Sequence, residues 1–161
     1  MPSTPGSTRR SRRDNRGVVA TAVKRAGIRA VVQSGWAELA PAGDDILPIG
    51  DLPHDWLFPR MAAVVHHAGA GTTGAGLRAG VPAVPVPVAV DQPFWAARLH
   101  RLGVAPHPIP LTDLTANALA GALRSCIDEP AYRRRAAELG RRIRAEDGPA
   151  DVLAVVARNQ R

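Results

Sequence analysis

Short, continuous apolar runs alternate along the chain with segments of helical periodicity. The apolar runs, rich in β-branched residues, predict buried strands at 28–32, 46–49, 62–66 and 81–88, of which 46–49 is weaker because Pro48 interrupts it. Helical spacing predicts the helices, and several of them end at a glycine. They are expected at 18–26, at 53–58 (one turn), shortly before Gly80, and at 93–102, 115–127, 130–145 and 148–158.

The alternation of strands and helices indicates the fold class. Strands that are apolar throughout are typical of a parallel sheet with helices on both faces, so we expect an α/β fold with a doubly wound parallel sheet of the Rossmann-like kind. The segment 81–88 contains prolines at 82, 85 and 87. Because proline cannot donate to a strand ladder, this segment is predicted to be an edge or irregular strand.

The rest of the composition sets the limits of the domain. Residues 1–16 are rich in Pro, Ser, Thr and Arg without periodicity, so we expect a disordered basic arm before a single domain at 17–161. No apolar segment of a secretory signal follows these arginines, and no apolar run is long enough for a membrane span. Cys126 is the single cysteine of the sequence, which is too few for an internal disulfide or a structural zinc site. A cytoplasmic location is the expectation.

The net charge of +7 raises the question of a nucleic-acid partner. Residues 1–16 carry +4 and residues 124–161 carry +3, whereas residues 17–123 are neutral. Aromatic residues make up only 4% of the chain, so no basic stripe interleaved with aromatics is present in the sequence. We therefore expect no nucleic-acid binding.

A glycine-rich motif, GAGTTG at 69–74, directly follows the predicted strand 62–66 and precedes a helix. Backbone amides at such a turn and at a helix N-terminus bind anions such as phosphate. Three interpretations remain open from the residues alone. The glycines could only permit a tight turn, or they could form a dinucleotide fingerprint with Asp91 as the ribose-binding acid, or they could hold another phosphorylated ligand.

A longer segment resembles a known family. The sequence from Val64 to Gly103, with SGW at 34–36 and IGDLPHDWLFPRM at 49–61, is similar to the donor-binding half of GT-B glycosyltransferases, in the branch of antibiotic and sterol 3-beta-glucosyltransferases. The resemblance covers about residues 17–155. It implies a UDP- or TDP-sugar as donor, a small lipophilic acceptor such as a sterol, macrolide or glycopeptide, inversion at the sugar, and no metal or other cofactor.

The resemblance also implies residue roles. The diphosphate is expected at His67 and at the motif positions Gly69, Ala70, Gly71, Thr72 and Thr73. The sugar hydroxyls are expected at Asp91 and Gln92, and the nucleoside near Ser34, Trp36 and His54. His66 is expected to be a structural neighbour of the site. Ala75 stands where the plant branch has a ribose-binding glutamate.

The catalytic base of the family lies in an N-terminal acceptor half to which nothing in this sequence corresponds. Met1-Pro2-Ser3 resembles the end of a turn after the first strand of the donor half, which suggests that this strand is missing. We expect the chain alone to be inactive and to self-associate through an uncovered apolar face. A non-catalytic nucleotide-binding module and an NAD-type dinucleotide-binding domain are the alternatives.

Overall fold

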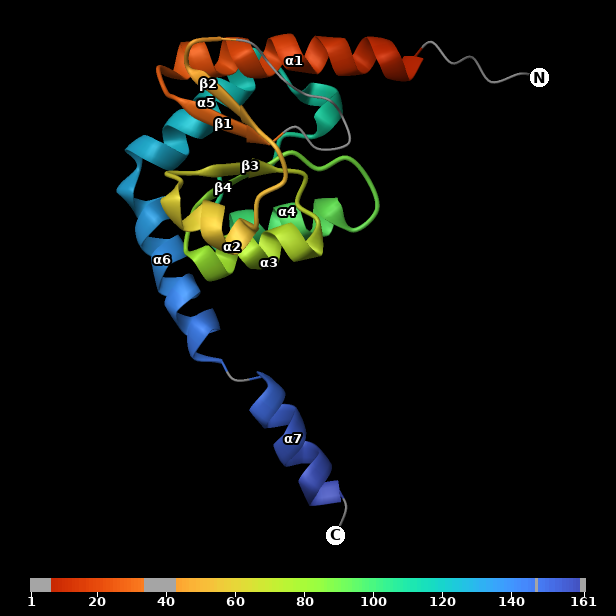
Figure 1. The fold of residues 1–161 in the computed structure, drawn as a ribbon, viewed down its shortest axis with the longest axis vertical. Helices are drawn as coiled ribbons and strands as arrows, with labels where there is room; N and C mark the ends of the chain where they lie inside the picture. The colour runs from red at the N-terminus through yellow and green to blue at the C-terminus, as the bar shows by residue number, and fades with distance from the viewer. Residues whose placement is uncertain (1–6, 34–42, 147, 160–161) are drawn as a thin grey trace, which may run out of the picture.

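Two pairs of parallel strands form the centre of the fold (Figure 1). The computed structural model describes residues 7–33, 43–146 and 148–159. In the first pair, β1 (Ala30–Gln33) lies beside β2 (Ile46–Ile49). In the second pair, β3 (Val64–His66) lies beside β4 (Ala83–Pro85). The α/β class with parallel strands is confirmed, and the described residues divide the predicted sheet into these two two-stranded sheets.

Pro85, the last residue of β4, and Pro87, just after it, lie where the backbone needs an acceptor and no donor. Val86 N–H donates to the carbonyl of His66 on the β3 side. On the other side, the carbonyls of Pro85 and Pro87 accept the N–H groups of Ile109 and Leu111. Proline supplies the acceptor and lacks only the donor, so at these two positions it costs no ladder hydrogen bond.

Helices cover both faces of the second sheet. The α-helices are α1 (Ser7–Ala26), α2 (His54–Leu57), α3 (Ala70–Ala79), α4 (Gln92–Arg101), α5 (Ala116–Asp128), α6 (Pro130–Ala145) and α7 (Gly148–Asn159), with 3₁₀ turns η1 (Phe58–Arg60) and η2 (Leu111–Asp113). Ala83 of β4 belongs to one apolar cluster with residues of α2, α4 and α6, and Val84 belongs to another with residues of α1 and α5. This division of successive residues is what a sheet buried on both faces requires.

The first helix begins earlier than the sequence pattern predicts. Residues 7–16, expected to be disordered, form the first half of α1, whereas residues 1–6 lie outside the described residues. In the sequence, Pro5 and Gly6 directly precede the first residue of this helix. Arginine, which is frequent after them, is a good helix former. The apolar residues that pack, among them Ala22 and Ala26, are confined to the second half, which is why periodicity revealed only that half.

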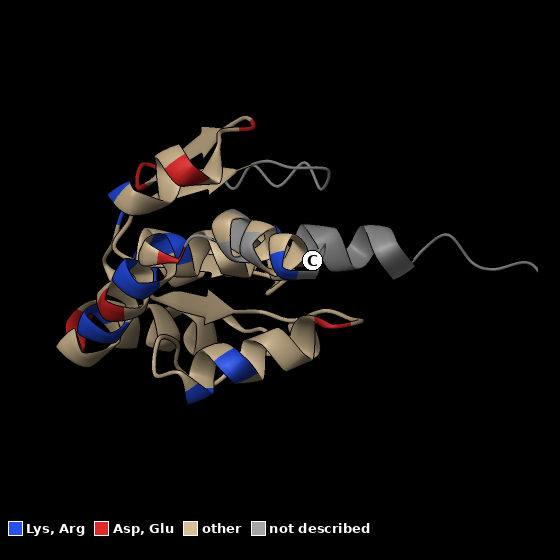
Figure 2. Cartoon of the chain, turned by 90° about the horizontal axis from the view of Figure 1, so that it is seen from below, with Lys and Arg blue, Asp and Glu red and all other residues tan. Residues whose placement is uncertain are grey.

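Among the residues that Figure 2 colours, the basic positions are spread over several elements, with acidic positions among them. Arg124 pairs with Asp128 at 2.6 Å, and Arg135 of α6 pairs with Glu138 at 2.8 Å. These are local pairs on exposed helix surfaces, where each contributes little to stability.

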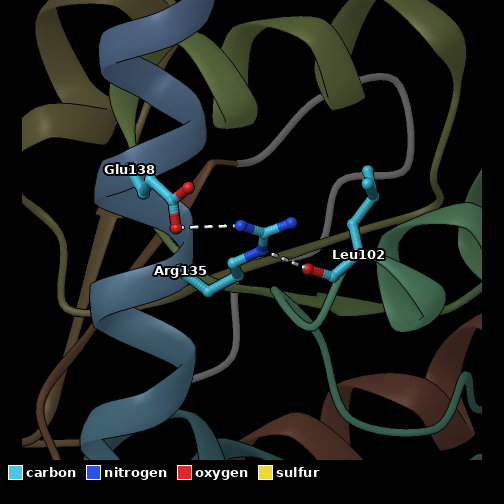
Figure 3. Close-up of polar contacts among 3 residues, drawn as sticks. All are labelled: Leu102, Arg135 and Glu138. Atoms are coloured by element: carbon cyan, nitrogen blue, oxygen red, sulfur yellow. Dashed lines mark hydrogen bonds and ion pairs between the residues drawn. The ribbon is translucent and has the colours of Figure 1, made fainter.

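A side chain of α6 holds the end of α4 (Figure 3). Arg135 Nε donates to the carbonyl of Leu102 at 3.1 Å, and Leu102 caps the C-terminus of α4. The last carbonyls of a helix have no partner within the helix, and a guanidinium there also complements the helix dipole. Glu138 holds the other edge of the guanidinium, so Arg135 ties α6 to the C-terminus of α4.

The same helix crosses α3 at a point where only hydrogen atoms fit. Gly80 ends α3 in the left-handed region, with φ of +73°. A Cβ on Gly140 of α6 would lie 2.8 Å from Gly80 Cα and 2.9 Å from the carbonyl oxygen of Leu77. Both neighbours are backbone atoms, so they cannot move aside alone. The crossing fixes α3, and therefore the turn in front of it.

We expect Gly140→Ala to destabilise the protein by about 1–3 kcal/mol, because the methyl group forces two backbones apart. Gly121 of α5 is the matched control, since a Cβ there meets no atom within 4 Å. Gly121→Ala should stabilise by about 0.5–1 kcal/mol through helix propensity alone. Urea unfolding of both variants measures the difference, and equal effects would contradict the close crossing.

Candidate nucleotide-sugar site

The turn after β3 places the candidate site. β3 ends at His66, and Ala68 then adopts a left-handed conformation with φ of +64° while fully buried. That conformation costs an L-residue about 1–2 kcal/mol. His66 offsets this cost, because its Nδ1 accepts the Ala68 N–H at 3.0 Å. The chain is thereby turned so that Gly69 begins α3.

The motif predicted as a loop is the first turn of a helix. Gly69 is the N-cap of α3, and Ala70 to Thr73 are helical. The first amides of an α-helix have no partner within the helix. Gly69 has no side chain to cap them, and the first turn contains no acidic residue. No side chain of the helix itself therefore neutralises the partial positive charge at this end, so the end can bind an anion.

The two threonines of this turn differ in access. Thr72 is half-buried, whereas Thr73 is only 2% exposed, and among the described residues its Oγ1 has no hydrogen-bond partner. A ligand outside the helix can meet Thr72. Thr73 faces the interior in this conformation.

The two histidines also differ. His67 is exposed, and its ring lies against Gly69, where a Cβ would come within 2.5 Å of His67 Nε2. Gly69 has an ordinary φ of −65°, so glycine is needed there for space and not for conformation. The absence of a side chain lets the imidazole lie at the start of α3.

His66 stays neutral in the folded chain. Burial, with smaller contributions in the same direction from the charges of His67 and His54, lowers its pKa to about 4. Its Nδ1 accepts from Ala68, so the proton of the neutral ring is on Nε2. That Nε2 is buried without a hydrogen-bond partner among the described residues.

The segment after β4 reaches the same edge as this turn, because β3 and β4 are parallel neighbours and their carboxyl ends coincide. Asp91 is exposed there and accepts the Trp95 indole N–H at 3.0 Å. Gln92 Oε1 accepts the N–H groups of Val88 and Ala89 at 2.8 and 3.2 Å. The segment that contains Asp91 and Gln92 thus leaves the sheet at the edge from which the glycine motif also starts, and the oxygen of Gln92 is engaged in holding its own loop.

The loop that Gln92 holds contains a strained residue. Val90 has a φ of +60° and is 94% exposed. A β-branched residue in this region is a genuine outlier. The sequence contains no signal for this conformation, since valine neither favours a left-handed turn nor an exposed position.

The predicted nucleoside residues are only partly described. Ser34 and Trp36 lie outside the described residues. His54, at the start of α2, stacks on Phe58 with ring centroids 4.5 Å apart, and its charge acts on His66. His54 is therefore brought near the turn after β3.

Sequence reasoning missed a polar pair at the ends of the first sheet. Gln33 Nε2 donates to Asp51 Oδ1 at 3.0 Å, from positions at and just after the ends of β1 and β2. Their place at the carboxyl ends of parallel strands was the available signal. A hollow of about 750 Å³ between α1 and residues 43–46 contains none of the predicted site residues.

Neither a metal centre nor a membrane span is visible in the described part of the chain. Its His, Cys, Asp and Glu residues form no group of three that could hold a metal ion. Among the same residues, no helix combines the length and apolar character needed to cross a bilayer.

Comparison with known proteins identifies relatives over this whole region. The family described as erythromycin biosynthesis protein CIII-like, C-terminal domain, matches residues 21–158. The O-mycaminosyltylonolide 6-deoxyallosyltransferase of Streptomyces fradiae is 46% identical over 129 residues, which are 80% of this chain and 30% of that enzyme. The sterol 3-beta-glucosyltransferase UGT80A2 of Arabidopsis thaliana is 40% identical over 139 residues, 84% of this chain and 22% of the enzyme.

Solved structures agree with these relatives. The kitacinnamycin glycotransferase superposes with a TM-score of 0.75 at 27% identity, over 88% of this chain and 39% of that one. The glycosyltransferase VinC, solved in complex with DTDP, gives 0.72 at 29% identity, over 87% and 37%. The resemblance to GT-B glycosyltransferases is confirmed. The chain spans less than half the length of each of these proteins.

The half-buried His66, whose ring is neutral in the folded chain at pH 7, makes stability depend on pH. Its folded pKa lies below the unfolded value of 6.5, so the unfolded chain takes up a proton first as the pH falls. We expect the free energy of unfolding to fall by about 2–3 kcal/mol between pH 7 and 4.5 on account of this group. His66→Asn removes the titrating ring, and should remove that part of the slope in urea unfolding. Parallel pH profiles for the two proteins would show that His66 titrates normally.

Proposed function

The chain belongs to the family of erythromycin biosynthesis protein CIII-like C-terminal domains, and on that premise we propose that it is the donor-binding half of a nucleotide-sugar-dependent glycosyltransferase. The observation that carries the proposal is the uncapped N-terminus of α3 beside His67, at the same sheet edge as Asp91 and Gln92. An anion site and a hydroxyl-binding pair side by side match the two parts of a nucleotide sugar.

The diphosphate lies at the start of α3 in this proposal. The amides of Gly69, Ala70 and Gly71 and the hydroxyl of Thr72 donate to its oxygens, and His67 adds a donor from the preceding turn. Thr73 joins them only if the first turn of α3 rearranges, because its hydroxyl is buried. These groups stabilise the charge of the departing nucleoside diphosphate, so no metal is required, and EDTA should leave nucleotide affinity unchanged.

The sugar lies at the N-terminus of α4. The Asp91 carboxylate can accept hydroxyl hydrogens, while the Trp95 N–H fixes its orientation. Gln92 contributes its amide N–H groups, since Oε1 already serves the loop. The nucleoside extends toward His54, whose ring plane is fixed by Phe58, and toward Ser34 and Trp36. The DTDP of VinC supports a thymidine donor, and UDP is the alternative.

The complete reaction needs an acceptor half. In the proposed reaction a base there takes the proton of an acceptor hydroxyl, and that oxygen attacks the anomeric carbon as the bond to the diphosphate breaks. The acceptor is a lipophilic hydroxyl compound, as the macrolide and sterol relatives suggest. Exposed apolar residues of α7, among them Val152 and Leu153, support an interface with the acceptor half, or with a second copy when that half is absent.

We expect His67→Ala to weaken TDP or UDP binding by about 1.5–3 kcal/mol, the value of a hydrogen bond to a charged group. His100→Ala, on the exposed surface of α4, is the control and should bind as the parent does. Titration calorimetry measures both. Unchanged affinity in His67→Ala would remove His67 from the diphosphate site.

Asp91→Asn separates the sugar from the nucleotide. If Asp91 holds only hexose hydroxyls, affinity for the free nucleoside diphosphate should stay nearly unchanged, while affinity for the nucleotide sugar falls by about 1–3 kcal/mol. The two titrations share one protein sample. Equal losses for both ligands would place Asp91 on the ribose and favour the dinucleotide-type alternative.

The 161-residue chain alone is expected to transfer no sugar. Positioning of the reactants lowers the barrier by about 7–11 kcal/mol, and a general base accelerates transfer by about 10²–10⁴-fold. Both effects need the acceptor half. Mass spectrometry of reactions with a sterol and macrolide panel tests this. If glycosylated product formed faster than the donor is hydrolysed, a base within this chain would be required.

A further inference from the structure

His66 has unusual surroundings for a residue next to a ligand-binding histidine. One ring nitrogen accepts the Ala68 N–H at 3.0 Å, and the other is buried without a partner among the described residues. A histidine that bound phosphate would need a donor nitrogen open to the ligand. Neither nitrogen of His66 is available in this way.

The accepted N–H belongs to the residue that turns the chain. Ala68 is fully buried and left-handed, and it is the link between the end of β3 and Gly69. A buried amide without a partner would lose the hydrogen bond that it makes to water in the unfolded chain, in addition to the cost of the left-handed conformation. The ring of His66 therefore contributes to the direction in which Gly69 and the first amides of α3 point.

The bond also fixes the state of the ring. An unprotonated Nδ1 can accept, whereas in a protonated ring Nδ1 carries a hydrogen of its own, so it can no longer accept the Ala68 N–H and the contact breaks. The groups whose charges act on His66 are His67, its neighbour in the turn, and His54 of α2, and both disfavour a charged ring. Burial acts in the same direction.

We propose that His66 is the positioning residue of the nucleoside diphosphate site: its neutral ring, through the Ala68 amide, holds the start of α3 and the His67 ring in the arrangement that binds the diphosphate. This inference rests on the proposed function. It assigns to His66 no contact with the ligand, and it explains why two adjacent histidines serve one site.

Two substitutions separate the acceptor from the ring. His66→Asn keeps an acceptor, because Oδ1 is bonded to Cγ as Nδ1 is. His66→Leu keeps comparable bulk and has no acceptor. We expect TDP or UDP affinity within about 3-fold of the parent for His66→Asn and a loss of about 10-fold for His66→Leu by titration calorimetry. The Ala68 amide should exchange slowly with solvent in the parent and in His66→Asn, and faster in His66→Leu.

Nitrogen-15 NMR of the parent chain gives a readout that needs neither ligand nor variant. His66 should show an unprotonated Nδ1 and a protonated Nε2 from pH 7 down to pH 5. A proton on Nδ1, or a His66→Leu variant that binds nucleotide as the parent does, would overturn the inference while leaving the donor site intact. A parent chain that binds neither TDP nor UDP would overturn the proposed function, and this inference with it.

Discussion

The hydrogen bond from the buried Ala68 N–H to His66 Nδ1 is the contact on which the site depends. It stabilises a left-handed alanine that joins β3 to α3 with only His67 and Gly69 beside it, so the helix begins almost where the strand ends. The crossing of Gly140 over Gly80 holds the far end of the same helix. With both ends fixed, the amides of the first turn keep one direction, which is the preorganisation that binding a diphosphate demands.

Much of the fold could be predicted from periodicity. The α6 helix (Pro130–Ala145) has the predicted bounds, and the four predicted strands contain β1 to β4, except that β1 ends one residue later. Two features could not be foreseen. The first half of α1 carries arginines, which are good helix formers, and it contains no apolar residues whose spacing could reveal a helix. The division into two two-stranded sheets depends on backbone distances between strands that no local pattern encodes.

The sequence pattern indicates which strands flank the candidate site, but not the side-chain contacts within it. Continuous apolar strands imply a parallel arrangement, and β3 and β4 are indeed parallel neighbours, so the segments that follow them leave the sheet at one edge. The roles of His67 and Asp91 at that edge stay predictions. The burial of Thr73, the engagement of Gln92 with its own loop and the left-handed Val90 were not predictable, since each depends on tertiary contacts. The relatives resolve the ambiguity of the glycine motif in favour of glycosyltransferases over dinucleotide enzymes.

The central claim is that this turn and helix bind the diphosphate of a sugar nucleotide. Titration calorimetry of the purified chain with TDP, UDP and NAD tests it most directly. The account predicts one-to-one binding of TDP or UDP and no binding of NAD. Binding of NAD with equal or higher affinity, or binding of none of the three, would contradict it.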